Sequence, residues 1–458
     1  MEILGRELAE WTGGHWINGQ PDCVGELVFD SRLILPDSHS VFVAMTHGQG
    51  DGHSFVESAI SSGAIASIVE RELDLDCPQL VVPDSLQALG RIGQSVRDRY
   101  AGSVIAVTGS CGKTSTKELL KAALGAEQTY AKAGNWNNKM GVPLTLYGLR
   151  DSASKFAIIE AGISERGEMS ELSAMIQPDF CVITSIGEAH LAGLESLNGV
   201  AEEKAKVLES ARSQALLIAP KSVLKLSPFQ AYRNRSICVS DVEAVLEPKE
   251  GVFAYAFESI APFQSKVCVE FSKQSLVFNL HTSSVGMIQN AVLAMATAHH
   301  LGVDLNAVVK GLESWRPDPN RGAISKIGDT LFYQDAYNAN PSSMMDALDS
   351  FQRGACTFTQ KLYVLGVMDE LGMDAESLHR GITKRLLPEE GSELIFIGSE
   401  SLTAAYREGA QSAGWEKEAL HCYDCAKYVK SMVENFSGAV FLKGSRSCHL
   451  ESLIPNNL

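Results

Sequence analysis

The sequence predicts a three-domain α/β protein whose central domain is a doubly wound, mostly parallel sheet. Strand-like apolar runs such as FAIIEAG and FCVITSIG alternate with helical stretches such as GEMSELSAMI and VAEEKAKVLESA between residues 84 and 315. The chain has 458 residues, of which 45% are hydrophobic. This length exceeds what one hydrophobic core accommodates, and the composition is sufficient to bury several cores without disulfides or metals.

The first unit, residues 1–83, is expected to be a small α/β domain. Its strand-like runs ELVFDSR, SVFVAM, ASIVE and LVVP are separated by turns rich in glycine, aspartate and proline. The helical stretch HSFVESAISSGA lies between two of these runs. We therefore expect the first domain boundary near Pro83.

The third unit, residues 316–458, begins in the segment WRPDPNRG, whose prolines, glycine and charges are typical of a linker. Beyond it, the apolar runs KLYVLGVM, ELIFIGS and AVFLKGS each reach a glycine and are spaced by helix-length segments. This alternation predicts a C-terminal Rossmann-like α/β domain.

The central unit, residues 84–315, carries the most informative motif, TGSCGKTST at residues 108–116. The motif follows the apolar run 104–107 and precedes the helix-like KELLKAAL. A strand, a glycine-rich turn and a helix start form a phosphate cradle of backbone N–H groups, to which Lys113 adds charge and Thr114 a magnesium-binding hydroxyl. Val107 stands where the common G-x-x-x-x-G-K-[ST] pattern has its first glycine, so an ordinary glycine-capped helix is the alternative. The flanking strand and helix favour ATP as the ligand.

The bulk composition argues against several classes of partner. A formal net charge of −16 opposes binding to nucleic acid or anionic lipid. The N-terminal MEILGRELAEWTGG has no basic segment followed by an apolar core, and no stretch reaches 18 uninterrupted apolar residues. We therefore expect a cytoplasmic protein with no membrane insertion. We also expect a monomer. The ten cysteines are scattered, which is typical of reduced thiols, and the lone pair Cys422 and Cys425 is only a weak zinc or redox signal.

Several polar residues fall at predicted strand ends, where α/β enzymes place reactive groups. Glu160 ends FAIIE and His190 follows FCVITS, so that together they could hold a second magnesium, although each is equally compatible with a structural role. Lys204, flanked by two glutamates in VAEEKAKVLES, has by itself the pattern of a solvated helix lysine. The loop QDAYNANPSS, residues 334–343, has little packing rationale and indicates contact with a ligand.

Taken together, these residues resemble the ATP-dependent Mur ligases, the family that builds the peptidoglycan stem peptide. TGSCGKTST is similar to their phosphate loop, whose shorter glycine spacing accounts for Val107. Similar segments extend nearly from end to end: VFDSR, FVAM, AGNWNNKMGVPLTL, IIEAG, EAHLAGLESLNGVAEEKAKV, NRG, DAYNANPSSM, MDELG and KGSRS. DAYNANPSSM and KGSRS most resemble the members that use UDP-N-acetylmuramoyl-tripeptide and D-alanyl-D-alanine as substrates.

The resemblance implies a catalytic set of Lys113, Glu160, His190 and Lys204. Lys113 would bind the ATP phosphates, Thr114 and Glu160 would hold one magnesium, and His190 with Glu160 would hold the second. Lys204 would be a carbamylated lysine that orients this second metal. The other implied ATP contacts are Gly109, Ser110, Cys111, Gly112, Ser115, Asn138, Asn290, Arg321 and Asp335. The implied substrate contacts are Ser31 and Arg32 for the uridine nucleotide, and Tyr337, Asn338, Asn340, Ser445 and Arg446.

The implied reaction assigns one task to each domain. Residues 1–83 would bind the UDP substrate, residues 84–315 would bind ATP, and residues 316–458 would close over ATP and bind the dipeptide. A peptide carboxylate would attack the γ-phosphate, and an amine would then displace phosphate from the acyl phosphate. Because water would hydrolyse that intermediate, we expect large hinge motions near Pro83 and residues 316–319.

Three segments depart from the family pattern. Residues 284–287, SVGM, replace a G-R-H-N run that contributes to adenine recognition, and Val367 replaces an aspartate in G-D-M-x-E-L-G. Residues 46–48, THG, replace a lysine-glycine pair. A Mur ligase paralogue that joins a different acid and amine is therefore one alternative, and a non-catalytic nucleotide-binding protein is another.

Overall fold

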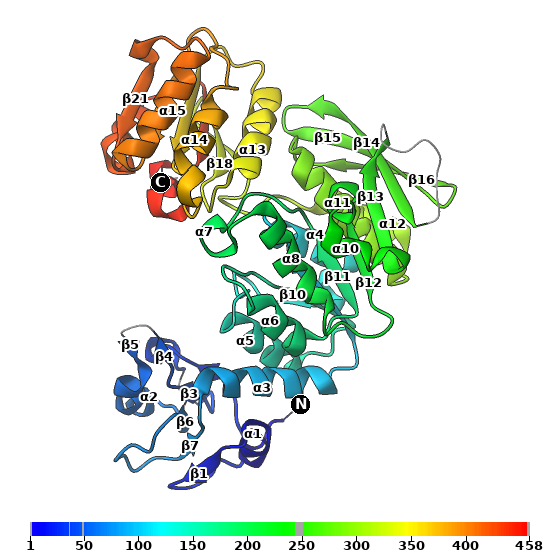
Figure 1. Ribbon diagram of the computed structural model, residues 1–458, viewed down its shortest axis with the longest axis vertical. Coiled ribbons are helices and arrows are strands. Elements are labelled where there is room, and N and C mark those ends of the chain that lie inside the picture. Colours follow the sequence, from blue (N-terminus) through cyan, green and yellow to red (C-terminus); the bar gives the residue numbers. More distant parts are fainter. Residues whose placement is uncertain (1, 36, 48–49, 243–250, 456–458) are drawn as a thin grey trace.

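Three β-sheets follow one another along the long axis of the computed structural model (Figure 1). The structure describes residues 2–35, 37–47, 50–242 and 251–455. The α/β fold class with mostly parallel sheets, as the sequence predicts, is confirmed. The boundaries expected near Pro83 and Arg316 fall in the connections between the sheets.

The N-terminal sheet has five strands in the order β1-β7-β6-β3-β2, and β1 is its antiparallel edge. Helix α1 (Gly5–Thr12), which we did not predict from the sequence, buries Leu8 and packs against the first helix of the middle domain. A two-stranded hairpin of β4 (Thr46–His47) and β5 (Gly50–Asp51) stands beside the sheet. The remaining bounds are β1 His15–Ile17, β2 Leu27–Val28, β3 Val41–Val43, α2 Val56–Ser61, β6 Ala66–Val69 and β7 Gln79–Val81.

The middle sheet has nine strands in the order β16-β15-β14-β13-β12-β11-β8-β10-β9. The seven strands β8 to β14 are parallel, and β15 (Gln264–Phe271) and β16 (Gln274–Leu280) extend the sheet in antiparallel fashion, which we did not predict. Buried residues alternate along β15 because every second side chain points to one face. The parallel strands are β8 Ser103–Thr108, β9 Thr129–Ala131, β10 Phe156–Glu160, β11 Phe180–Ile183, β12 Leu216–Pro220, β13 Ser236–Asp241 and β14 Val252–Ala261.

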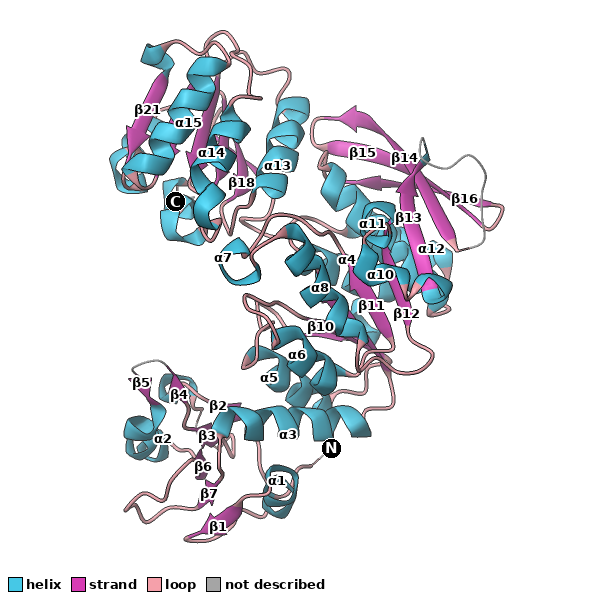
Figure 2. Cartoon of the chain, in the orientation of Figure 1, coloured by secondary structure: helices cyan, strands magenta, loops and turns pink. Residues whose placement is uncertain are grey.

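Helices cover both faces of the middle sheet, as a doubly wound fold requires (Figure 2). One layer packs around α3, whose N-cap Asp84 accepts a hydrogen bond from the Gln87 N–H. The opposite layer packs around α11, which is almost wholly buried from Ile288 onward. The first layer is α3 Ser85–Arg99, α5 Gly141–Tyr147, α6 Glu168–Ile176 and α8 Leu197–Ala205, and the second is α4 Lys113–Leu124, α11 Val285–His300 and α12 Leu305–Ser314.

The C-terminal sheet has the strand order β17-β18-β22-β19-β20-β21, in which β17 is antiparallel and the others are parallel. Helices on its two faces complete a separate hydrophobic core. The strands are β17 Ala323–Ile327, β18 Thr330–Asp335, β19 Lys361–Gly366, β20 Glu393–Ile397, β21 Leu420–Tyr423 and β22 Ala439–Lys443. The helices are α13 Pro341–Gly354, α14 Ala375–Thr383, α15 Glu400–Ser412 and α16 Lys430–Glu434.

The fold brings strand ends of two domains to one place. Glu160 pairs with Val107 in the register of β10 and β8, so the end of β10 lies beside the glycine-rich loop after β8. In the C-terminal sheet, Asp335 pairs with Lys443 where β18 and β22 end. The Asn340 side-chain amide then reaches across to donate a 3.4 Å hydrogen bond to the Ser110 carbonyl in the loop. Among the described residues, no helix combines the length and apolarity needed to cross a membrane.

Candidate active site

The loop after β8 requires glycine at two positions. Gly109 has a φ of 153°, and a Cβ there would lie 1.9 Å from the Thr184 hydroxyl oxygen. Gly112 has a φ of 79°, and a Cβ there would lie 2.5 Å from the Asn290 amide nitrogen. The Thr184 hydroxyl also donates a 2.5 Å hydrogen bond to the Cys111 carbonyl. This bond ties the loop to the residue that follows β11. The short glycine spacing thus follows from close packing against β11 and α11.

Lys113 begins α4 and turns back over the loop. Its ammonium donates a 2.9 Å hydrogen bond to the Gly109 carbonyl, which folds the side chain along the cradle. Burial lowers the pKa of Lys113, and the nearby Glu160 carboxylate opposes that shift. A bound phosphate would add a further negative partner for this ammonium.

Glu160 is the centre of a buried polar group at the end of β10. It is 4% exposed, and its carboxylate accepts a 3.0 Å hydrogen bond from the Thr114 hydroxyl. The other carboxylate oxygen accepts a 2.8 Å hydrogen bond from the Asn137 amide. Lys117 lies 3.9 Å away and is held by the carbonyls of Lys132 and Gly134. Sequence reasoning missed Asn137 and Lys117, although Asn137 belongs to the polar stretch AGNWNNK.

Asn138, the neighbouring residue that the sequence assigns to ATP, has a local role in this structure. Its side-chain oxygen accepts hydrogen bonds from the backbone N–H groups of Met140 and Gly141, at 3.2 and 2.9 Å. Those groups open α5, so Asn138 stabilises the start of that helix. Its contact with ATP stays a prediction.

Lys204 has the opposite environment from the solvated lysine that its flanking glutamates indicate. The residue is 0% exposed, and its Nζ has no hydrogen-bond partner among the described residues. Burial lowers the pKa of Lys204 well below 10.5, and the charge of Lys113 adds to the shift. The adjacent Glu203 points elsewhere and accepts hydrogen bonds from the backbone N–H groups of Gly167 and Met169. Burial thus shifts the Lys204 amine towards its neutral form, close to Lys113 of the phosphate loop.

His190 lies at the boundary with the C-terminal domain. Its Nδ1 is 2.5 Å from a carboxylate oxygen of Glu370, a residue that sequence reasoning did not assign to the site. The backbone of His190 is left-handed, with a φ of 55°, where the short helix α7 (Leu191–Leu194) begins. In the described part of the chain, no three His, Cys, Asp or Glu side chains gather as a metal site. The joint metal role of His190 and Glu160 stays a prediction.

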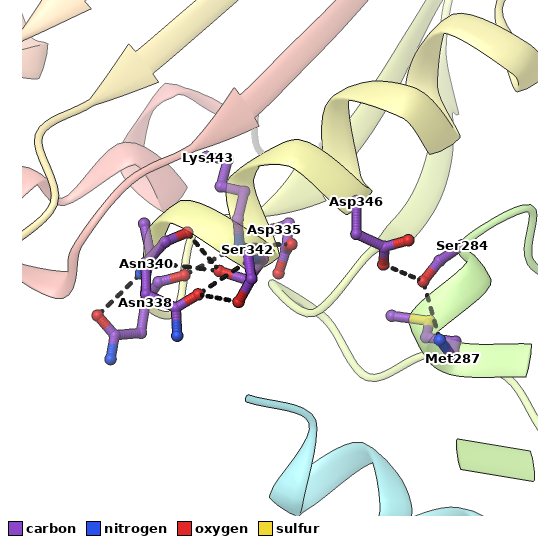
Figure 3. A network of polar contacts seen from close by, with 10 residues as sticks. Ser284, Met287, Asp335, Asn338, Asn340, Ser342, Asp346 and Lys443 are labelled. Carbon is purple, nitrogen blue, oxygen red and sulfur yellow. Dashed lines mark hydrogen bonds and ion pairs between the residues drawn. The ribbon is translucent and has the colours of Figure 1, made fainter. Parts of the chain in front are cut away.

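An ion pair between the buried Lys443 and the partly buried Asp335 lies where β18 and β22 end (Figure 3). Lys443 donates hydrogen bonds to the Asp335 carboxylate at 2.7 Å and to the Asn338 carbonyl at 3.0 Å. Burial raises the pKa of Asp335, and the Lys443 charge opposes the shift. Asn340 caps α13 by accepting from the Ser343 N–H at 2.9 Å. Lys443 precedes the Ser445 and Arg446 that the sequence assigns to the substrate, and it was not itself predicted.

Two guanidinium groups surround Tyr337 in the same loop. The guanidinium carbon of Arg321 lies 3.8 Å from the centre of the Tyr337 ring, and that of Arg446 lies 5.9 Å from it. Ser445 is buried beside them and accepts a 2.8 Å hydrogen bond from the Asp369 N–H. The structure thus brings Arg321, Tyr337 and Arg446 together.

Ser31 and Arg32 lie in the N-terminal domain, within a short 3-10 turn. Arg32 donates two side-chain hydrogen bonds to Asp30, at 2.9 and 2.7 Å, and they lower the pKa of Asp30 to about 2. This turn follows β2 of the N-terminal sheet, whereas the phosphate loop follows β8 of the middle sheet. Their contact with a uridine nucleotide stays a prediction.

This geometry can be compared with known families. The model for the Mur ligase middle domain matches residues 107–298, and the model for the Mur ligase, glutamate ligase domain matches residues 322–446. The chain belongs to the Mur ligase family. The assignment that the sequence motifs predict is confirmed, and this Mur ligase is an enzyme of the ligase class.

The relatives of this Mur ligase match it over nearly the whole length. It is 27% identical to the UDP-N-acetylmuramoyl-tripeptide–D-alanyl-D-alanine ligase of Bacillus subtilis (strain 168), with 98% of this chain and 97% of that protein covered. The ligase of the same name from Escherichia coli (strain K12) is 27% identical, with 93% and 92% covered. Among solved structures, MurF from Acinetobacter baumannii superposes with a TM-score of 0.85 at 27% identity, with 99% of this chain and 98% of that chain covered.

Two departures from the Mur ligase pattern have structural explanations. Ser284 caps α11 by accepting a 3.0 Å hydrogen bond from the Met287 N–H, and its hydroxyl donates to Asp346 of the C-terminal domain (Figure 3). Val367 is 6% exposed and packs against Gly398 in the C-terminal core, where an aspartate would be a buried charge. In the third departure, Gly48 lies outside the described residues, and Thr46 donates a 3.2 Å hydrogen bond to Glu70.

Proposed function

We propose that this protein is the ATP-dependent ligase that joins D-alanyl-D-alanine to UDP-N-acetylmuramoyl-tripeptide. The observation that carries the proposal is similarity over the full length, because the Bacillus subtilis ligase of that specificity covers 98% of this chain. The central domain alone would not distinguish substrates, since ligases with other substrates share a nucleotide-binding core. Matches in the N- and C-terminal domains favour this pair over another acid and amine.

ATP would bind where the loop after β8 faces the loop after β18. Loop N–H groups and Lys113 would hold the phosphates, since Lys113 is a partly desolvated cation at a helix start. Arg321 supplies a further positive charge near Lys113. Asp335, fixed by Lys443, offers a carboxylate to the ribose hydroxyls.

The residues present fit magnesium and a carbamylated lysine. The Thr114 hydroxyl and the Glu160 carboxylate, 3.0 Å apart, are the hard oxygen donors that magnesium prefers. Lys204 is buried and without a hydrogen-bond partner among the described residues, and its lowered pKa favours the neutral amine that combines with carbon dioxide. When bound, magnesium would offset charge on the transferring phosphoryl oxygens. His190 would have to leave Glu370 to take part.

The reaction we propose has two steps. The terminal carboxylate of the tripeptide attacks the γ-phosphate of ATP, which gives an acyl phosphate and ADP. The free amine of the dipeptide then attacks the acyl carbon, and phosphate leaves. Lys113 and Arg321 stabilise the phosphoryl oxygens in the first step. Closure of the C-terminal domain, already tied to the loop through Asn340 and Ser110, would exclude water.

The ATP and UDP-linked substrates also support a site of action in the cytoplasm.

The decisive experiment measures phosphate release from ATP by the purified full-length protein. We expect release only when UDP-N-acetylmuramoyl-tripeptide and D-alanyl-D-alanine are both present. Controls contain each substrate alone, the tripeptide with single amino acids, and the dipeptide with UDP-N-acetylmuramate. Release with another acid and amine, and none with the proposed pair, would contradict the assignment.

A further inference from the structure

Lys117 is a buried lysine that the proposed reaction does not use. It lies on α4 one helical turn after Lys113, and its side chain is 3% exposed. Its ammonium donates hydrogen bonds to the carbonyls of Lys132 and Gly134, at 3.0 and 2.9 Å. Burying an ammonium is costly, and a methionine of similar length would fill the same space without a charge. Packing alone therefore does not explain a lysine at this position.

The Lys117 ammonium has one N–H donor more than these two carbonyls require. Its Nζ also lies 3.5 Å from a carboxylate oxygen of Glu118 and 3.9 Å from Oε2 of Glu160. The Glu118 side chain is 27% exposed and that of Glu160 is 3% exposed, so the pair with Glu160 is the one shielded from water. Lys117 thus supplies a positive charge to a carboxylate that burial would otherwise penalise.

The two carbonyls that Lys117 holds lie in the connection between β9 and α5. Further along this connection, the Asn137 amide donates its 2.8 Å hydrogen bond to Oε1 of Glu160. The Asn137 carbonyl in turn accepts a 2.8 Å hydrogen bond from the Gly162 N–H, just beyond the end of β10. Residues 132–137 are therefore held by Lys117 at one end and by the end of β10 at the other.

Both oxygens of the Glu160 carboxylate are consequently fixed. Oε1 accepts from Asn137, and Oε2 accepts from the Thr114 hydroxyl at 3.0 Å and lies near the Lys117 ammonium. Hydrogen-bonding partners that orient a ligating carboxylate typically change metal affinity about 10- to 100-fold. An orientation that is set in advance also spares the metal the entropy of ordering the side chain.

We propose that Lys117 is a positioning residue for the magnesium site. It holds residues 132–137 against the end of β10, so that the Glu160 carboxylate has one orientation when magnesium binds. The inference rests on the proposed function, in which Thr114 and Glu160 hold that ion. A purely structural Lys117 would only satisfy two carbonyls, and its loss would lower stability without changing metal affinity.

The test measures metal binding by the full-length protein with a saturating non-hydrolysable ATP analogue. The probe is Mn²⁺, which takes the same oxygen ligands as magnesium and whose free concentration is read by electron paramagnetic resonance. Lys117→Met should raise the Kd for Mn²⁺ about 10-fold. The affinity for the analogue in EDTA should stay unchanged, because the phosphate loop and Lys113 are intact. Lys121→Met, which removes a partly exposed lysine one turn further along α4, is the control and should change neither constant.

A double variant tests whether Lys117 acts through residues 132–137. Asn137→Ala should itself raise the Kd for Mn²⁺, because it frees Oε1 of Glu160. In Lys117→Met with Asn137→Ala, the Kd should be close to that of Lys117→Met alone, since both changes release the same carboxylate. Two effects that multiply would show that the residues act independently, and the proposal would be wrong.

A milder variant keeps the test decisive if Lys117→Met does not fold. Lys117→Gln retains an N–H group for one of the two carbonyls, and circular dichroism confirms its fold. Its Kd for Mn²⁺ should rise by about 3-fold, less than in Lys117→Met. Native Mn²⁺ affinity in folded Lys117→Gln, whatever its melting temperature, would overturn the positioning role.

The metal measurement needs neither the acid nor the amine substrate. An error in the proposed pair would leave the Mn²⁺ constants unchanged and would appear only as phosphate release with a different pair. Absence of Mn²⁺ binding by the native protein with the ATP analogue would overturn the role of Lys117, even if the proposed pair were ligated.

Discussion

Asp346 accepts a 2.5 Å hydrogen bond from the Ser284 hydroxyl across the boundary between the C-terminal and middle domains. The same carboxylate accepts a 3.2 Å hydrogen bond from the Gly286 N–H in the first turn of α11. A carboxylate at a helix N-terminus is favourable because the free N–H groups there carry positive charge. Ser284 lies in the segment 284–287, where this chain departs from the family pattern, so this contact joins the two domains at that departure.

Asp346 lies on α13, and a second set of contacts also joins this helix to the middle domain. The Ser283 hydroxyl lies 2.9 Å from that of Ser350, and Arg353 donates a 2.8 Å hydrogen bond to the Ser283 carbonyl. Phe263, from the turn between β14 and β15, belongs to the hydrophobic core of the C-terminal domain and packs against Gly354. The end of α11 that faces the phosphate loop is therefore tied to the C-terminal domain.

We expect Asp346→Ala to lower the free energy of unfolding by about 1–2 kcal/mol, because it removes two hydrogen bonds and a negative charge from the N-terminus of α11. The measurement is chemical denaturation followed by circular dichroism. Asp349→Ala is the matched control, since Asp349 is an exposed residue on the same helix. Equal stability of the two variants would show that the Asp346 contact contributes nothing.

Lys204→Met should abolish activity and yet stabilise the protein. The buried amine has no hydrogen-bond partner among the described residues, so an apolar side chain of similar length should raise the unfolding free energy by about 1 kcal/mol. Turnover should fall about 100-fold or more, because the proposed carbamate is lost. Lys206→Met, which removes a partly exposed lysine paired with Glu203, is the control and should retain turnover.

The stability gained in Lys204→Met should depend on pH. The folded-state pKa of Lys204 is lowered, so the unfolded chain binds more protons between that pKa and 10.5, and native stability rises with pH over this window. The advantage of the variant should therefore shrink as the pH is raised towards 10.5. Denaturation curves from pH 7 upward test the sign, and a constant advantage would contradict the lowered pKa.

Gly109→Ala should eliminate ATP binding, because its Cβ would lie 1.9 Å from the Thr184 hydroxyl oxygen and its φ of 153° suits glycine. The loop would have to move away from β11, and its N–H groups would no longer converge. Titration calorimetry with a non-hydrolysable ATP analogue gives the affinity. Gly381→Ala is the control, since a Cβ there meets nothing within 4 Å. Native affinity in Gly109→Ala would show that the loop does not depend on this glycine.

Asn137→Ala and Asn138→Ala should have different effects. Asn137 donates a 2.8 Å hydrogen bond to Glu160, so its loss should raise the magnesium concentration needed for half-maximal activity, about 10-fold. Asn138 accepts two hydrogen bonds from backbone N–H groups at the start of α5, so its loss should lower stability by about 1 kcal/mol and leave the magnesium requirement unchanged. Magnesium titrations of activity, together with thermal melts, compare the two. The reverse pattern would assign the ligand-facing role to Asn138.

Sequence reasoning was most effective where function depends on a short contiguous pattern. The strand, glycine turn and helix at 103–124 could be predicted because the local φ values and the helix start require those residue types. Glu160 could be placed at a strand end for the same reason. Asn137 and Lys443 were missed, because each acquires its role through contacts with residues outside its own motif, Glu160 for Asn137 and Asp335 for Lys443.

The sequence by itself determined the α/β class, the phosphate loop and the family. The alternation of strand-like and helix-like segments and the short sequence motifs are local properties of the chain. Only the tertiary structure decided that Lys204 is buried without a partner among the described residues, because that depends on which elements cover it. It also decided that His190 meets Glu370 and that Asp346 meets Ser284. Contacts between residues 180 and 62 positions apart follow from how the domains pack, and no local pattern encodes them.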